Sequence, residues 1–269
     1  MKSINILELT NSIRNEGYEG EYIDAKLCQD IILLLISKSA YANNITIKGG
    51  LVMRSISNNT RRATLDIDLD FIRYPLTDEG INNFINSLNG IMGIKIDIIG
   101  NPEELKHQDY EGKRVYINIE DKYNNRLTSK IDIGVHKYVD LKQEEYYFDF
   151  SFDIDGVTLF INPKEQILAE KIKSILKFGF LSTRYKDIYD IYYLTSFVNK
   201  KKTIEAFKVL IFDDDKMKEK NINDIINRLE STFSNKVYID RLSSSNKNWL
   251  GISNEEVLNG INKFLKELI

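Results

Sequence analysis

The sequence predicts an α+β protein in which a β-sheet is preceded and followed by helices. Residues 45–161 alternate apolar and polar side chains with the period of two that is typical of strands. Residues 1–44 and the chain from residue 163 onward instead show apolar residues at helical spacing. One helix near residues 78–89 interrupts the strand-rich region. This order of segments indicates the α+β class.

The first 44 residues are expected to be helical, and residues 31–36 are too continuously apolar for a surface helix, so they should be buried. Strand alternation occurs in residues 45–47, 65–71, 94–99, 114–119, 129–135 and 157–161, and residues 146–154 also fit it. Asp155-Gly156 is typical of a hairpin turn, so neither Asp153 nor Asp155 receives a catalytic role. Asp97, another acid in an apolar strand, lacks an adjacent glycine turn and receives none either.

The C-terminal part is expected to be helical. Asn162-Pro163 indicates a helix start with proline in the first turn, and residues 184–194 are predicted to form a further helix. The chain has three prolines, and none forms an obvious linker. We divide the chain into residues 1–161, a core with N-terminal helices, and residues 162–269, a helical domain.

Composition narrows the class of protein without identifying it. The 269 residues are 42% hydrophobic and 11% aromatic, which is enough for a proper core. A formal charge of −3 argues against an overall electrostatic grip on nucleic acid, so any RNA contact needs a local basic surface. The single cysteine, Cys28, excludes an internal disulfide and favours a reducing compartment. No signal pattern or membrane-length apolar run occurs, so we expect a soluble, cytoplasmic protein.

Residues 66–70 place acids at alternate positions of a predicted strand. Asp66, Asp68 and Asp70 therefore share one face, while the apolar residues between them face the core. Neighbouring acids on that face lie roughly 6.6 Å apart and, at an effective dielectric of about 20, repel by roughly 2.5 kcal/mol. Oxygen ligands at this spacing suit a hard cation such as magnesium. The alternative is a solvated edge strand of an amphipathic sheet.

A glycine pair precedes this strand and favours the metal interpretation. Gly49 and Gly50 are predicted to form a tight turn between a short strand and a helix whose first turn is residues 51–54. Free N–H groups and the positive end of the dipole at a helix N-terminus bind phosphate. Phosphate beside paired acids is the chemistry of nucleotidyl transfer.

A third acid, Asp132, interrupts the apolar strand of residues 130–135. Two magnesium ions about 3.5–4 Å apart can stabilise the attacking and leaving oxygens of a phosphoryl displacement. Asp66 and Asp68 would bridge the ions, and Asp132 would orient or deprotonate the attacking hydroxyl. The alternative for a lone strand aspartate is a surface position near a turn.

These motifs, together with a later box, resemble the AbiEii family of nucleotidyltransferase toxins over roughly residues 40–195. The matching residues are Gly49-Gly50, Arg62-x-Thr64-x-Asp66-x-Asp68, Asp132, Glu170-Lys171 and Arg184-x-Lys186-Asp187-x-x-Asp190. The resemblance implies the nucleotidyltransferase fold of the polymerase-β-like superfamily, a mixed β-sheet core with flanking helices. It also implies that the later box, in the helical C-terminal part, completes the active-site cleft. The spacing from Gly50 to Asp66 is longer than in the wider superfamily, which leaves the phosphate contacts open.

The resemblance assigns the site residues in three sets. The implied catalytic residues are Asp66, Asp68, Asp132, Lys171 and Asp187; the implied nucleotide-binding residues are Lys48, Gly49, Gly50, Arg62, Thr64, Arg184 and Lys186; the implied metal ligands are Asp66, Asp68 and Asp132. Without the family, Lys171 would be interpreted as a cation reaching solvent past an apolar stripe, and the acids of residues 187–190 as partners in local ion pairs. Asp70 and Asp190 receive no assigned role.

The implied activity is magnesium-dependent transfer of a nucleoside monophosphate from a nucleoside triphosphate to an acceptor hydroxyl, with two Mg²⁺ ions and release of pyrophosphate. The implied biological role is a toxin of an AbiE-like type IV toxin–antitoxin or abortive-infection system, with RNA such as tRNA as acceptor and a cognate antitoxin as partner. Two alternatives remain: a nucleotidyltransferase that modifies a small molecule such as an antibiotic, and a catalytically silent nucleotide-binding protein. A basic groove beyond the triphosphate would favour RNA, and a closed pocket would favour the small molecule.

Overall fold

The structure is a computed structural model that describes the chain except residues 1–2, 106–111, 138–139 and 151–154. The chain divides into two compact units, residues 1–139 with 143–162 and residues 140–142 with 163–269. Residues 151–154, which include Asp153 and the end of the predicted strand at residues 146–154, lie outside the described residues, whereas Asp155 and Gly156 of the predicted hairpin turn are described. Each unit is considered by itself below.

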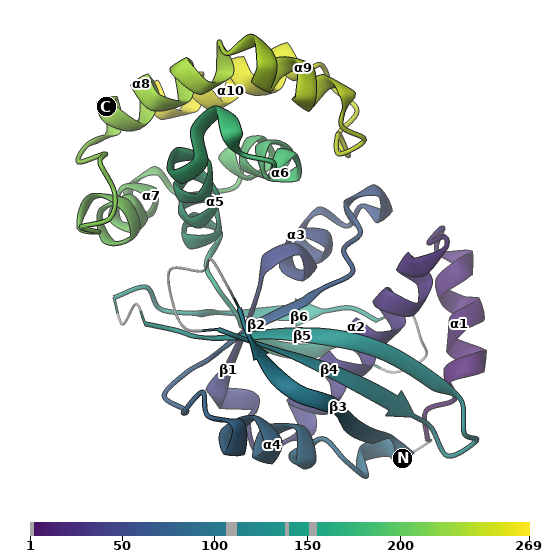
Figure 1. Cartoon of the computed structure of the whole chain (residues 1–269). Coiled ribbons are helices and arrows are strands. Elements are labelled where there is room, and N and C mark those ends of the chain that lie inside the picture. Colours follow the sequence, from purple (N-terminus) through teal and green to yellow (C-terminus); the bar gives the residue numbers. More distant parts are fainter. Residues whose placement is uncertain (1–2, 106–111, 138–139, 151–154) are drawn as a thin grey trace. The chain divides into compact units, whose positions relative to one another are not determined.

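The first unit contains a mixed sheet and four α-helices within the described residues (Figure 1). Its helices are α1 (Ile6–Asn15), α2 (Glu21–Lys38), α3 (Gly49–Ser57) and α4 (Asp78–Ser87). Its strands are β1 (Ile45–Lys48), β2 (Ile67–Phe71), β3 (Lys95–Glu104), β4 (Lys113–Glu120), β5 (Arg126–Val135), β6 (Glu144–Phe148) and β7 (Val157–Ile161). The strand order is β3-β4-β5-β2-β1-β7-β6. The predicted α+β class is therefore confirmed.

The central strands pair with their neighbours in both parallel and antiparallel orientations. Strand β2 pairs with β5 in parallel and with β1 antiparallel, and β1 pairs with β7 in parallel. Parallel neighbours need crossover connections, which the helices between these strands provide. As a result, segments far apart in the sequence meet in the middle of the sheet.

Side-chain alternation sets the orientation of β2. Ile67, Leu69 and Phe71 are fully buried, and Phe71 packs edge-on against Phe84 of α4 with ring centroids 5.5 Å apart. Because neighbouring residues of a strand face opposite sides, burial of this apolar row places Asp68 and Asp70 on the other face. Residues 31–36 of α2 are also buried, as the sequence predicted.

The second unit is helical in the residues described. Its α-helices are α5 (Lys164–Phe178), α6 (Tyr185–Thr195), α7 (Lys200–Phe207), α8 (Ile222–Phe233), α9 (Lys236–Ser244) and α10 (Asn254–Lys266), and a π-helical segment spans Lys208–Phe212. Contrary to the sequence prediction, Pro163 is the N-cap of α5 and does not lie in its first turn, because its φ of −55° and ψ of +151° are not helical. Within the described residues, no helix combines the length and apolar character needed to cross a membrane.

Candidate active site

Two of the predicted metal ligands occupy paired positions on neighbouring strands. Asp68 of β2 lies opposite Asp132 of β5 in the parallel register. Paired residues of adjacent strands point to the same face, so the two carboxylates lie side by side, although 64 positions separate them in the sequence. Asp66 directly precedes β2. The sheet therefore gathers the three predicted acids at one end of β2 and beside it.

The two glycines contact the acid-bearing segment closely enough to exclude larger residues. Gly49 has a φ of +69°, and a Cβ built on it would lie 2.1 Å from Oδ2 of Asp68. A Cβ on Gly50 would lie 2.6 Å from Oγ1 of Thr64. The glycines are the first two residues of α3 rather than a separate turn before it, since the extended Lys48 is the N-cap. The N–H of Gly50 donates a hydrogen bond to Asp68, which joins the helix start to the acid.

Basic side chains of neighbouring strands hold two of the acids. Arg114 of β4 is the cross-strand partner of Asp132 and donates two hydrogen bonds to its carboxylate, both 2.8 Å long. Lys130 of β5 lies 2.8 Å from Oδ1 of Asp66. The sequence interpretation missed both cations. The signal for Lys130 is its position two residues before Asp132, on the same face of the strand.

Lys48 and Asp70 form a further ion pair across β1 and β2, with Nζ 2.5 Å from Oδ1. Asp70 is 5% exposed, so its charge is largely removed from water and needs a partner. Lys48 was predicted to bind nucleotide; in this structure its ammonium group is bound to Asp70. The pair gives Asp70 a role in holding β1 against β2.

The ionised form of Asp68 is disfavoured by its surroundings. The pKa of Asp68 is raised to about 6, chiefly by burial and in part by the nearby charges of Asp132 and Asp66. The charge of Lys48 and the hydrogen bond from Gly50 act in the opposite direction. When other carboxylates disfavour the ionised form of a carboxylate, a cation bound among them stabilises that ionised form.

The donor set fits a divalent cation, but the acids do not converge on one point. Asp66, Asp68 and Asp132 offer oxygen ligands, which hard cations prefer. In the part of the chain that the structure describes, no three His, Cys, Asp or Glu side chains are arranged to hold a metal ion. Asp66 and Asp132 instead face Lys130 and Arg114. A metal held by the three acids would replace these ion pairs.

The second unit contains a separate buried cluster around Lys171 of α5. Its ammonium group lies 2.5 Å from Oδ1 of Asp187 and 2.8 Å from Oδ2 of Asp190, both on α6. Asp190 is fully buried and also accepts a hydrogen bond of 3.0 Å from the indole N–H of Trp249. Lys171 therefore does not reach solvent past an apolar stripe. Asp190 joins α5, α6 and the segment before α10.

The other predicted nucleotide-binding residues differ in exposure. Arg62 is 3% exposed and lies in the short 3-10 helix Thr60–Arg62, whereas Thr64 is half-buried beside Gly50. Arg184 is the N-cap of α6, and its exposed guanidinium lies 3.8 Å from Asp187. Lys186 is half-buried in the first turn of α6. The first unit contains Lys48, Gly49, Gly50, Arg62, Thr64, Asp66, Asp68 and Asp132, and the second contains Lys171, Arg184, Lys186 and Asp187.

Comparison with known proteins identifies the family. A family model described as the nucleotidyl transferase AbiEii toxin of a type IV toxin–antitoxin system matches residues 31–249 of the 269. This range includes every predicted site residue. A search of curated proteins gave no match. The chain therefore belongs to the AbiEii family of nucleotidyl transferase toxins, and it is a nucleotidyltransferase of a type IV toxin–antitoxin system.

Proposed function

We propose that this toxin transfers a nucleoside monophosphate from a nucleoside triphosphate to a hydroxyl group of RNA, such as a tRNA end, and releases pyrophosphate. Magnesium is the proposed cation, with two ions per site. The observation that supports the proposal best is the pairing of Asp68 with Asp132 next to the glycine start of α3. It joins acids that suit a hard cation to a helix N-terminus that suits phosphate.

The proposed chemistry divides among residues of the first unit. Asp66, Asp68 and Asp132 hold the metal, which, when bound, supplies positive charge to the phosphoryl oxygens and orients the reacting groups. The glycines let the start of α3 approach the phosphates closely, because no side chain intervenes. Asp132, whose carboxylate is oriented by Arg114, positions the acceptor hydroxyl or accepts its proton.

We also propose catalytic roles for Lys171 and Asp187 and nucleotide-binding roles for Arg184 and Lys186. Their ion pairs fix the Lys171 ammonium group within α5 and α6. Membership of a type IV system implies an antitoxin partner, which we propose to be encoded beside this chain. That the second unit completes the cleft stays a prediction.

The proposal is tested by incubating the protein with Mg²⁺, total cellular RNA and each of four labelled nucleoside triphosphates. A labelled band of tRNA size identifies the transferred base and the acceptor class. Asp68→Asn is expected to lower the rate at least about 100-fold, equivalent to roughly 2.7 kcal/mol of barrier. Asp97→Asn is the matched control, because Asp97 is also an acid in a strand but is exposed and paired with Lys95. It should leave the rate unchanged.

The outcomes separate the alternatives. Label on RNA that is lost only in Asp68→Asn supports the proposal. Turnover of the triphosphate without labelled RNA would favour a small-molecule acceptor. Binding of the triphosphate without any turnover, with or without Asp68, would favour a catalytically silent protein and contradict the metal assignment.

A further inference from the structure

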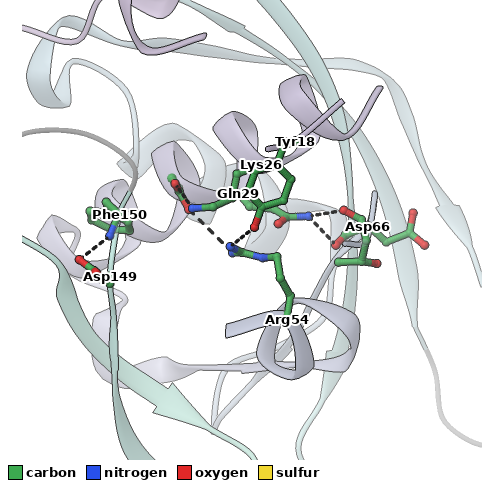
Figure 2. A network of polar contacts seen from close by, with 9 residues as sticks. Tyr18, Lys26, Gln29, Arg54, Asp66, Asp149 and Phe150 are labelled. Atoms are coloured by element: carbon green, nitrogen blue, oxygen red, sulfur yellow. Dashed lines mark hydrogen bonds and ion pairs between the residues drawn. The ribbon is translucent and has the colours of Figure 1, made fainter. Parts of the chain in front are cut away.

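Gln29 of α2 contacts the segment that leads into β2. Its Nε2 donates to the main-chain oxygen of Thr64 at 2.9 Å and to that of Asp66 at 3.4 Å. The side chain is fully buried. Figure 2 shows the amide of Gln29 directed at the main chain of Asp66, whose carboxylate points away from the amide.

The segment held by Gln29 has no regular secondary structure. Residues 63–66 lie between the 3-10 helix Thr60–Arg62 and β2. The side-chain amide of glutamine has two N–H donors, so one Gln29 can bind both main-chain oxygens. The bonds from Gln29 therefore restrict the main chain on both sides of Leu65.

The interaction is unusual for a residue needed only for packing. Among the described residues, Oε1 of Gln29 has no hydrogen-bond partner. An apolar side chain of the same size would avoid burying that unsatisfied oxygen. The fold therefore depends on the hydrogen bonds that Nε2 of Gln29 donates and not on Oε1.

The residue after Gln29, Asp30, connects α2 to α3, the helix that begins with Gly49. Asp30 binds Lys26 on its own helix, and its Oδ1 lies 3.8 Å from Nη2 of Arg54 on α3. Arg54 also donates to the hydroxyl of Tyr18 at 3.4 Å. This buried network is drawn in Figure 2. One turn of α2 thus contacts both the helix that begins with the glycines and the segment that contains Thr64 and Asp66.

We propose that Gln29 is a positioning residue of the nucleotidyltransferase site, which holds the main chain of residues 64–66 so that Asp66 stays in place to bind the metal. The inference rests on the proposed function, because it takes Asp66 as a metal ligand. Gln29 lies outside residues 31–249, the range that the family model matches.

The experiment measures direct binding of Mn²⁺, which replaces magnesium at oxygen sites and is detected by electron paramagnetic resonance of the free ion. Gln29→Met keeps the length of the side chain and removes both donors. Mn²⁺ should bind about 10-fold more weakly, the usual effect of removing a group that orients a ligand. Turnover in Gln29→Met should recover as the Mn²⁺ concentration rises, a rescue that a general loss of stability would not give.

Asn44→Leu is the matched control. Asn44 also donates from a side-chain amide to a main-chain oxygen, that of Ile72 at 3.2 Å, just after the opposite end of β2. Its loss should leave Mn²⁺ binding unchanged. Gln29→Asn, which retains the amide but is one methylene shorter, is the second variant, and it should weaken Mn²⁺ binding as well. Thermal unfolding verifies that each variant is folded.

Asp66→Ala distinguishes failure of this inference from failure of the proposed function. If Asp66→Ala weakens Mn²⁺ binding but neither Gln29 variant does, the inference is wrong and the metal assignment stands. If Asp66→Ala binds Mn²⁺ as well as the unchanged protein, the metal assignment fails and the inference fails with it. Equal weakening in Asn44→Leu, or two Gln29 variants that do not fold, would show a general structural role and overturn the inference.

Discussion

Substitution of Gly49 by alanine tests the contact between the start of α3 and Asp68. The new Cβ would lie 2.1 Å from Oδ2, 2.8 Å from Cγ and 2.9 Å from Cβ of Asp68. A normal contact needs more than 3 Å, so the carboxylate must move by roughly 1 Å, a misplacement that can cost about 100-fold in rate. The positive φ adds about 1–2 kcal/mol of backbone strain, and the forced contact adds about 1–3 kcal/mol.

Gly100→Ala separates the strain from the contact. Gly100 has a φ of +72°, close to that of Gly49, but among the described residues no atom beyond its chain neighbours lies within 4 Å of its added Cβ. Urea unfolding should show a loss of about 1–2 kcal/mol for Gly100→Ala and about 2–5 kcal/mol for Gly49→Ala. Transfer of labelled nucleotide to RNA should fall about 100-fold in Gly49→Ala alone. Equal rates in the two variants would refute the claim that Gly49 positions Asp68.

Three further predictions concern charge. The pKa of Asp68 is raised to about 6, so the folded protein holds this proton more tightly than the unfolded chain does. The free energy of unfolding therefore falls as pH rises from about 4 to about 6. In EDTA, Asp68→Asn should be about 1–3 kcal/mol more stable than the unchanged protein at pH 7 and about equal at pH 4, and no difference at pH 7 would contradict this. Arg114→Met should lower the free energy of unfolding by about 1–3 kcal/mol, since Asp132 loses its partner. The same variant should bind Mn²⁺ more tightly, because the guanidinium no longer competes; weaker binding would be evidence against that competition. Trp249→Phe should cost about 1–3 kcal/mol in urea unfolding followed by circular dichroism, because buried Asp190 loses a donor; an unchanged midpoint would show that Lys171 suffices.

Local patterning predicted the elements of the site. The alternation of residues 66–71 predicted β2, and the apolar run around Asp132 predicted β5. The glycine pair predicted the start of a helix, and α3 begins at Gly49. These features depend on the nearest neighbours in sequence, which determine side-chain periodicity and allowed backbone angles.

Pairing between distant segments was not predictable in the same way. Arg114 meets Asp132 only because β4 and β5 adopt one register, and a shift of one residue would turn these side chains to opposite faces. Gln29 lies in a largely apolar stretch, and no sequence pattern singles it out. The role of Gln29 depends on the loop of residues 63–66, which it contacts, and the helical periodicity of α2 gives no information about that loop.

The ion pairs of Asp66 with Lys130 and of Asp132 with Arg114 have a thermodynamic consequence. In the proposed reaction, a metal ion that entered alone would displace Lys130 and Arg114 from their carboxylates, and a triphosphate that entered alone would meet unshielded acids. A complex of metal and triphosphate provides both charges. The carboxylates of Asp66 and Asp132 can then bind the metal while Lys130 and Arg114 bind the phosphates, all in one step. Each ligand should then raise the affinity for the other by the same factor, as reciprocal linkage requires. The site would respond to the complexed nucleotide rather than to either component alone.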